Sequence, residues 1–229
     1  MMAIGPEAWE ALALSLRVAL VATAVNLPVG LAIAWALARR RFWGRGLLNL
    51  LAHLPLVLPP VVTGYLLLIT FGPQAPLGAW LGERGVVFAF RWTGAALAAG
   101  VMALPFMVRA IRLSLDAVDP GLEEAARTLG AGPVRVFATV TLPLIWPGIL
   151  AGAVLSFAKG LGEFGATITF VSSIAGETRT LPLLIDLTLE RPGAQAQVLG
   201  LSALALVFAA GALLLSEWLS RKAAAWVGP

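Results

Sequence analysis

The sequence EAARTLGAGPVRVFATVTLP at residues 124–143 decides the fold, because it is a polar island in a chain that is otherwise strongly apolar. It follows Asp119 and Pro120, which are an acceptor suited to a helix N-cap and a residue already fixed at helical φ. Gly130 suits the left-handed residue that ends a helix, and the Gly-Pro pair at 132–133 permits a turn and a second helix start. The stretch therefore predicts two short helices outside the lipid, between two membrane spans.

The first of these short helices is amphipathic. Its apolar residues follow i, i+3, i+4, i+7 spacing and so share one face: Leu122, Ala125, Ala126 and Leu129. Its polar residues occupy the remaining faces: Glu123, Glu124, Arg127 and Thr128. A short helix with small residues on its apolar face can press closely into a groove on another protein.

These positions resemble the EAA loop of binding-protein-dependent ABC importers, a Glu-Ala-Ala motif followed by a glycine, an apolar residue and Leu-Pro. The matching residues are Glu124, Ala125, Ala126, Gly130, Val140, Leu142 and Pro143, with valine where the family more often has isoleucine. The resemblance implies that residues 119–143 form a cytoplasmic coupling loop that docks into an ATPase subunit. We expect the contact to involve Leu122, Glu124, Ala125, Ala126, Leu129 and Gly130. The alternative is an ordinary amphipathic connector.

The composition places the chain in a lipid bilayer. Of its 229 residues, 59% are hydrophobic and only 12% are charged, against about 25% charged residues in soluble domains. A span needs ~20 apolar residues, so the length allows five or six spans and leaves no room for a soluble domain. We therefore expect one all-α integral membrane domain over residues 1–229, with its core at residues 11–219.

Composition and motifs also exclude several functions. The chain has no cysteine, which excludes disulfides, thiolate metal sites and a cysteine nucleophile, and we expect no cofactor. Residues 160–165 spell G-x-G-x-x-G, but no strand precedes them, so we reject dinucleotide binding. The net charge of +4 orients the protein in the membrane and does not indicate nucleic-acid binding. The acidic start, with Glu7 and Glu10, predicts that no signal peptide is cleaved.

Apolar stretches predict five spans. They cover roughly residues 11–38, 47–71, 93–113, 142–174 and 196–219. The second stretch is interrupted by Pro55, Pro59 and Pro60, and the fourth is longer than one straight span, so we expect it to be tilted or broken. Residues 181–190, outside the spans, predict a short helix.

The distribution of cations predicts the orientation. With five spans, ten cations fall on one side: Arg39, Arg40, Arg41, Arg45, Arg109, Arg112, Arg127, Arg135, Arg221 and Lys222. Four fall on the other side: Arg84, Arg91, Arg179 and Arg191. Because cations near span ends favour the cytoplasm, we expect a multi-pass protein of the inner membrane with its N-terminus outside and its C-terminus in the cytoplasm.

Two ionisable residues lie inside the fourth apolar stretch. Lys159 and Glu163 are one helical turn apart, in the orientation that favours an ion pair. Ionisable groups within a span normally face a cavity or a protein partner, so we take the pair as a candidate for a transport pathway. The alternative is that the span ends near Phe157 and both groups are interfacial. Further candidates are hydroxyls that could solvate an anion: Thr63, Ser156, Thr167 and Thr169.

Nearly the whole chain is similar to the permease subunits of bacterial molybdate importers. The similarity lies in residues 53–62 (HLPLVLPPVV), 108–112 (VRAIR), 126–132 (ARTLGAG), 161–170 (LGEFGATITF) and 176–182 (GETRTLP). Sulfate and tungstate permeases share much of this pattern. The resemblance implies a type I ABC importer transmembrane domain that carries molybdate, or a similar tetrahedral oxyanion, by alternating access.

The resemblance also implies a set of partners. These are a second copy of the chain, a cytoplasmic ABC ATPase dimer, a periplasmic oxyanion-binding protein and the surrounding lipid, with no nucleic acid. The chain itself has no P-loop, so a separate ATPase must supply the energy for uphill transport.

Two other classes of function are disfavoured. An intramembrane enzyme would need a constellation such as paired aspartates, a serine with a lysine, or histidine ligands, and Lys159 with Glu163 makes none of these. A secondary transporter is disfavoured because five spans without internal repeats are few for that class. We therefore expect a transport subunit without catalytic residues of its own.

Overall fold

The computed structural model describes residues 5–227, with side chains described up to residue 212 and for Leu214. All regular structure in this part of the chain is helical. The elements are α1 (Pro6–Arg39), α2 (Arg45–His53), the 3-10 turn η1 (Leu54–Leu56), α3 (Pro60–Phe71), α4 (Pro76–Gly82), α5 (Trp92–Ala117), α6 (Pro120–Thr128), α7 (Pro133–Val136), the π-helical turn η2 (Phe137–Thr141), α8 (Leu142–Leu161), α9 (Gly165–Val171), α10 (Leu181–Leu189) and α11 (Gln195–Val227).

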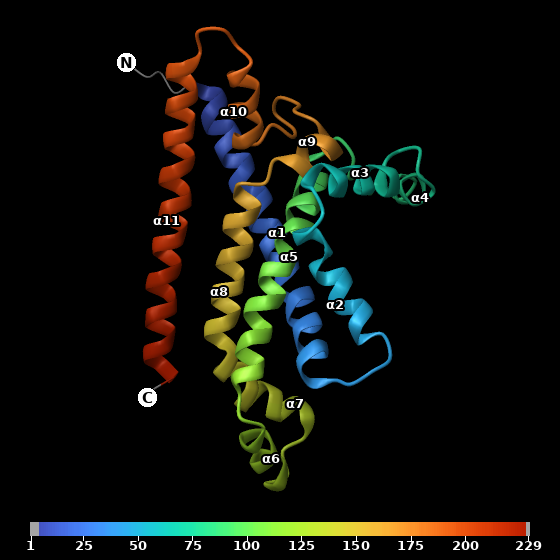
Figure 1. Cartoon of the computed structure of the whole chain (residues 1–229), viewed down its shortest axis with the longest axis vertical. Coiled ribbons are helices and arrows are strands. Elements are labelled where there is room, and N and C mark those ends of the chain that lie inside the picture. Colours follow the sequence, from blue (N-terminus) through green and yellow to red (C-terminus); the bar gives the residue numbers. More distant parts are fainter. Residues whose placement is uncertain (1–4, 228–229) are drawn as a thin grey trace.

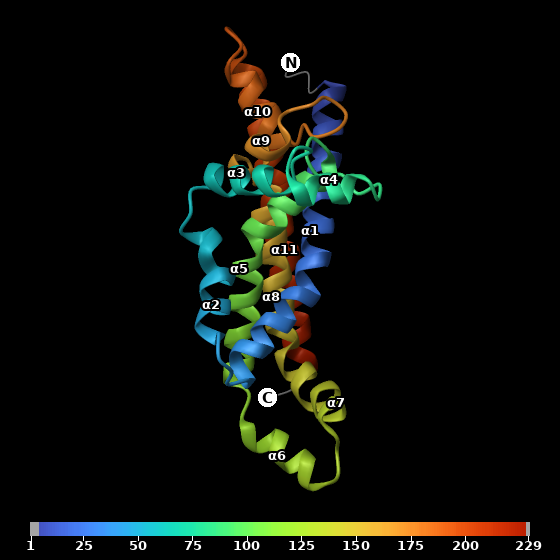
Figure 2. The same ribbon diagram turned by 90° about the vertical axis from the view of Figure 1, so that its right-hand side faces the viewer.

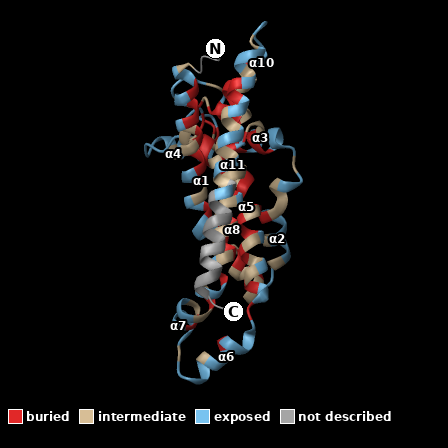
Figure 3. Cartoon of the chain, turned by 90° about the vertical axis from the view of Figure 1, so that its left-hand side faces the viewer, coloured by how far each residue is buried: buried red, intermediate tan, exposed pale blue. Residues whose placement is uncertain are grey.

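Three long helices, α1, α5 and α8, pack along one another to form the centre of the molecule, and α11 lies against α8 and α10 (Figure 1). The short helices α6 and α7 project from one end of this bundle, whereas α3, α4, α9 and α10 lie toward the other. Figure 3 shows that the buried residues follow the inner faces of the long helices, while the short helices α6 and α7 are largely exposed.

Small residues bring the central helices close together. On α5, Ala95, Ala98, Ala99 and Ala103 are fully buried, and helix pairs in membranes pack closely where the contact residues are small. A Cβ atom on Gly148 of α8 would collide with the side chain of Ser114, so this crossing requires glycine. The central bundle is therefore held by close backbone approach more than by large side chains.

A buried amide ties the same three helices together. Asn26 of α1 donates from Nδ2 to the carbonyl oxygen of Gly100 on α5, at 2.9 Å, and to the hydroxyl of Ser156 on α8, at 3.2 Å. Both side chains are buried. Hydrogen bonds of this kind fix the relative positions of membrane helices, because lipid offers no competing partner.

The described chain contains four helices that are long and apolar enough to cross a membrane: α1, α5, the continuous helix Pro133–Leu161, and α11. The fifth predicted span is a bent pair, in which Arg45–Leu56 and Pro60–Phe71 meet at 115°. The break falls at Pro59 and Pro60, where proline removes helical hydrogen bonds and restricts the preceding residue. The expectation of five spans therefore holds if this pair counts as one, and its second half lies across the bundle (Figure 2).

The long apolar stretch at 142–174 is broken, as its length suggested. Helix α8 ends at Leu161, and α9 begins at Gly165 after a short non-helical segment. At its other end, α8 continues without interruption into η2 and α7. The membrane helix is therefore directly joined to the polar segment that precedes it.

The two predicted groups of cations separate to opposite ends of the bundle. The helix ends and loops carrying Arg39–Arg45 and Arg127–Arg135 lie at the end from which α6 projects, whereas those carrying Arg84 and Arg179 lie at the other (Figure 1). Arg221 and Lys222 are two of the ten cations predicted for the cytoplasmic side, and their side chains lie outside the described residues.

Candidate functional site

The polar segment between α5 and α8 folds as its sequence predicts. The Asp119 carboxylate accepts a hydrogen bond from the backbone N–H of Gly121, at 2.8 Å, and Pro120 occupies the first position of α6. Gly130 has a φ of +85°, a left-handed conformation that side chains disfavour, and Pro133 begins α7. The predicted cap, turn and second helix start are all confirmed.

The apolar stripe of α6 faces away from its own chain. Leu129 is 89% exposed, and Leu122 and Ala125 are also exposed. Ala126 is half-buried, and the carboxylate of Glu124 lies in solvent. The predicted contact residues therefore lie at the projecting tip of the molecule, where a partner protein can reach them (Figure 2).

Glu123 was not singled out by sequence reasoning, yet it is the acidic side chain of α6 that turns inward. Only 8% of the residue is exposed, and it pairs with Arg39 at the end of α1. The helical spacing of residues 122–129 predicts only that Glu123 lies on a polar face, and it indicates no partner. Its main partner is 84 residues away in sequence, so no local pattern reveals the contact.

The pair Lys159–Glu163 lies where α8 ends and α9 begins, and the two side chains form an ion pair. Glu163 is 3% exposed, and its second carboxylate oxygen accepts a hydrogen bond from the backbone N–H of Ala166, at 3.1 Å. Lys159 keeps 31% of its side chain exposed. Glu163 is thus a buried carboxylate that is paired one helical turn away, at the break between α8 and α9.

The hydroxyl candidates on α9 differ in their surroundings. Thr167 is fully buried, whereas Thr169 is half-buried and donates to the carbonyl oxygen of Gly165, at 2.9 Å. Helix α9 packs tightly on α3, because a Cβ atom at Gly64 would collide with the backbone of Ala166. Thr63, next to that glycine, is buried and its hydroxyl has no hydrogen-bond partner among the described residues. The structure thus brings Thr63 and Thr169 to one helix pair, α3 with α9.

Ser156 lies elsewhere. Its hydroxyl accepts from Asn26 in the centre of the bundle, so it serves the packing of α1, α5 and α8. Of the four hydroxyl candidates, it is the one whose role the structure accounts for.

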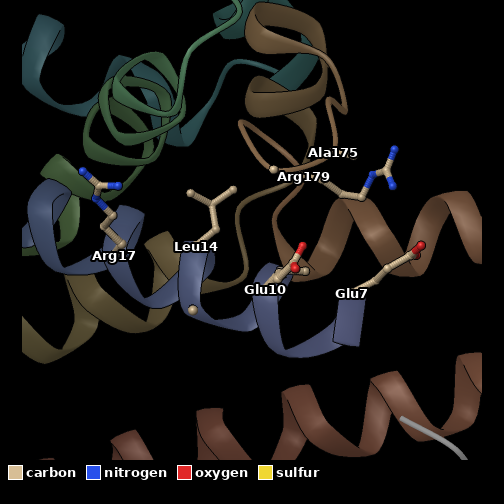
Figure 4. Close-up of a pocket in the computed structure, with 9 residues that line it drawn as sticks. Glu7, Glu10, Leu14, Arg17, Ala175 and Arg179 are labelled. Atoms are coloured by element: carbon tan, nitrogen blue, oxygen red, sulfur yellow. The ribbon is translucent and has the colours of Figure 1, made fainter. Parts of the chain in front are cut away.

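A pocket of about 610 Å³ lies between the first turns of α1 and the loop that carries Ala175 and Arg179 (Figure 4). It is lined by both signs of charge, from Glu7, Glu10 and Arg17 on α1 and Arg179 on the loop before α10. The Arg17 guanidinium lies 3.7 Å from the ring centroid of Trp92, and so stacks on an aromatic face.

Comparisons with known proteins identify a matching family and several similar permeases. The family model described as "Binding-protein-dependent transport system inner membrane component" matches residues 26–224. The molybdenum transport system permease protein ModB of Escherichia coli (strain K12) is 54% identical over 94% of each chain, and ModB of Haemophilus influenzae is 52% identical over 93% of each. The sulfate transport system permease protein CysT of Escherichia coli (strain K12) is 39% identical over 92% of this chain and 74% of the relative.

Solved structures show the same fold at low sequence identity. A crystal structure of an amino acid ABC transporter with histidines matches with a TM-score of 0.68 and 20% identity, over 95% of this chain and 94% of that one. A bacterial ABC transporter involved in the import of the acidic polysaccharide alginate matches with a TM-score of 0.75 and 18% identity, over 95% and 80%. The molecule thus has the helical fold of ABC transporter transmembrane domains. Its high identity to permease proteins makes it a transport subunit rather than an enzyme.

The match to the family model shows which family the chain belongs to. The chain belongs to the family of binding-protein-dependent transport system inner membrane components.

Proposed function

We propose that this chain is the permease subunit of an ATP-driven importer of molybdate or a similar tetrahedral oxyanion. The observation that carries the proposal is the 54% identity to a molybdenum permease over nearly the full length of both chains. The sulfate permease is more distant, at 39% identity. Sulfate, thiosulfate and tungstate are therefore the alternative cargoes.

The proposed complex contains two copies of the chain, an ATPase dimer in the cytoplasm and an oxyanion-binding protein outside. Support for a second copy comes from α3, which carries a row of exposed apolar side chains: Val61, Val62, Tyr65, Leu66 and Ile69. Non-helical backbone at membrane depth, such as the break before α3, is tolerated only where protein or a water-filled cavity covers it. A partner protomer meeting α3 across a central pathway provides both.

We assign ATPase coupling to residues 119–143 and in particular to the exposed stripe of α6. Closure of the ATPase pair draws the two copies of α6 together. Because α7 runs through η2 into α8 as one continuous helix, this movement reaches the membrane spans and alternates access to the pathway. The whole chain acts as one domain in this scheme.

In the proposed pathway, Lys159 attracts the divalent anion and Glu163 tempers that attraction, so that the anion is held weakly enough to leave. The hydroxyls of Thr167 and Thr169 belong to the same region of α9. The orientation follows from the cations: the end carrying α6 is cytoplasmic, and the N-terminus lies outside. The mixed-charge pocket of Glu7, Glu10 and Arg179 then faces the binding protein.

The test is uptake into proteoliposomes that contain this chain with an ATPase subunit and an oxyanion-binding protein of the same organism. We expect molybdate uptake that requires ATP and is blocked by vanadate. A large excess of sulfate should leave molybdate uptake intact. Uptake that sulfate abolishes would reassign the cargo, and uptake without ATP would reject the ABC importer altogether.

A further inference from the structure

The buried carboxylate of Glu123 joins three elements at the base of the bundle. Its Oε1 accepts from Arg39 Nη2 at 3.1 Å and from Thr141 Oγ1 at 3.0 Å, and its Oε2 accepts from Arg127 Nη2 at 3.3 Å. Arg39 is the last residue of α1, Thr141 is the last residue of η2 before α8, and Arg127 lies one turn along α6 itself. One side chain therefore links the projecting helix to two membrane spans.

The two neighbouring acids of α6 differ in burial, and only Glu123 makes this link. Neighbouring Glu124 is exposed, whereas Glu123 is 8% exposed and Thr141 is 2% exposed. Hydrogen bonds to an ionised carboxylate are shorter and about twice as strong as neutral ones. The contact with Thr141 is buried on both sides, whereas the Arg127 side chain is 53% exposed. The Arg39 side chain is 20% exposed, and its Nε atom has no hydrogen-bond partner among the described residues. The Glu123 carboxylate is therefore the described group that compensates the charge of this guanidinium.

The backbone of α6 has few other supports. It packs chiefly against α7 and η2, both of which follow it in the chain. Contact between α6 and the first span runs through the Arg39–Glu123 ion pair. Without that pair, a displacement of α6 would reach α1 only indirectly, through α5 and α8, against which α1 packs.

We propose that Glu123 is a positioning residue that transmits displacement of α6 to α1 and α8 together, so that ATP hydrolysis and movement of the spans stay coupled. The inference rests on the proposed function, in which α6 docks to the ATPase. Glu123 does not contact the ATPase, because its carboxylate points into the chain. Its loss therefore uncouples hydrolysis from transport and leaves docking intact.

The experiment compares Glu123→Gln and Arg39→Gln with the parental chain, each reconstituted with its ATPase and binding protein. Both ATP hydrolysis and molybdate uptake are measured on the same vesicles. In both variants we expect the ATPase to co-purify and to hydrolyse ATP, while uptake per ATP falls roughly tenfold, as loss of one charge-assisted hydrogen bond predicts. The double variant should be no worse than either single one, because both remove the same contact. Glu190→Gln, an exposed acid at the opposite end, serves as the matched control and should keep the parental ratio.

A second measurement does not depend on transport. Amide hydrogen exchange of the purified chain in detergent should rise across residues 120–128 in Glu123→Gln and stay parental in α8. A parental uptake-to-hydrolysis ratio in Glu123→Gln overturns the inference, and so does loss of ATPase binding or faster exchange throughout the chain. If the parental complex hydrolyses ATP without importing molybdate, the proposed cargo fails, and faster exchange confined to α6 still decides whether Glu123 holds that helix.

Discussion

The Glu163 carboxylate combines two contacts at the point where α8 stops. One oxygen pairs with Lys159, and the other accepts from the backbone N–H of Ala166 in the first turn of α9. Removing one partner of a buried pair costs more than the pair contributes, because the remaining charge loses its compensation. The pair is therefore a constraint on the break between two helices as well as a charge in the proposed pathway.

This arrangement predicts graded effects of substitution. Lys159→Met should reduce molybdate uptake more than Lys159→Arg, since arginine keeps both the positive charge and a partner for Glu163. Glu163→Gln should also reduce uptake, because its amide oxygen can still accept from Ala166 but the ion pair is lost. Uptake at matched membrane content measures the three variants, and the affinity of the binding protein for its anion should not change. Parental uptake by Lys159→Met would remove the pair from the pathway and leave the hydroxyls of α9.

A second residue-scale prediction concerns the polar tie in the centre of the bundle. Asn26→Val removes two hydrogen bonds, each contributing about 1 kcal/mol in membrane helices. Ser156→Ala removes one and leaves Asn26 bound to the carbonyl oxygen of Gly100. Thermal unfolding in detergent should therefore show a larger loss of stability for Asn26→Val, by about 2 kcal/mol, than for Ser156→Ala, by about 1 kcal/mol. Equal losses would mean that the amide contributes through Ser156 alone.

At the scale of elements, the residues of α6 that fix its fold differ from those that we propose contact the ATPase. Asp119, Pro120 and Gly130 fix where the helix begins and ends, and Glu123 fixes how it sits on the bundle. The exposed apolar stripe contributes to neither. Substitutions on that stripe can therefore abolish docking without disturbing the fold.

Leu129→Asp tests this separation. The residue is 89% exposed, so the substitution should leave expression and thermal stability unchanged, within about 0.5 kcal/mol. A buried, unpaired carboxylate at the docking surface should prevent co-purification of the ATPase. The same substitution at Leu189, an exposed leucine at the end of α10, is the matched control and should retain the ATPase.

Gly130→Pro should also cause loss of ATPase binding, because it disrupts the turn after α6 rather than the exposed surface of the helix. Proline cannot adopt the φ of +85° found at Gly130, and it lacks the N–H that bonds to the carbonyl oxygen of Arg127, at 2.9 Å. The turn between α6 and α7 should then open. A separate variant, Glu124→Lys combined with Ala126→Trp, should block docking by its changed charge and its added bulk. Membrane insertion should remain intact in both variants, and normal uptake in either would contradict the coupling assignment.

The whole molecule has two chemically different ends. One end carries α6, α7 and most of the cations, and the other carries the mixed-charge pocket and the loop around α4 (Figures 1 and 4). Since arginine and lysine accumulate on the cytoplasmic side of membrane proteins, the end with α6 should lie in the cytoplasm.

Single cysteines in this cysteine-free chain can check the orientation. Glu83→Cys lies beyond α4 and Arg135→Cys lies within α7, and both positions are exposed. An impermeant thiol reagent added to intact spheroplasts should label position 83 and spare position 135 until the membrane is opened. Labelling of both positions from outside would contradict the predicted topology.

Sequence reasoning reached the features whose cause is local. The cap at Asp119, the left-handed Gly130 and the interruption near Pro59 each follow from one or two residues, and the structure shows all three. It did not reach the 115° angle at that interruption, because prolines mark a break without setting its direction. Nor did it reach Glu123, whose partners Arg39 and Thr141 are brought near only by the packing of distant helices.

The π-helical turn η2 at Phe137–Thr141 sets the rotation of α6 and α7 about the axis of α8, the span that follows it. A π-turn accommodates one residue more than an α-helical turn, and each residue of an α-helix advances the chain by about 100° around the axis. Deleting a single residue there, and so restoring a regular helix, would swing α6 and α7 by about that angle relative to α8. The direction in which the molecule presents its tip is thus encoded by one surplus residue, and relatives that gained or lost it would have to meet their ATPase from a different side.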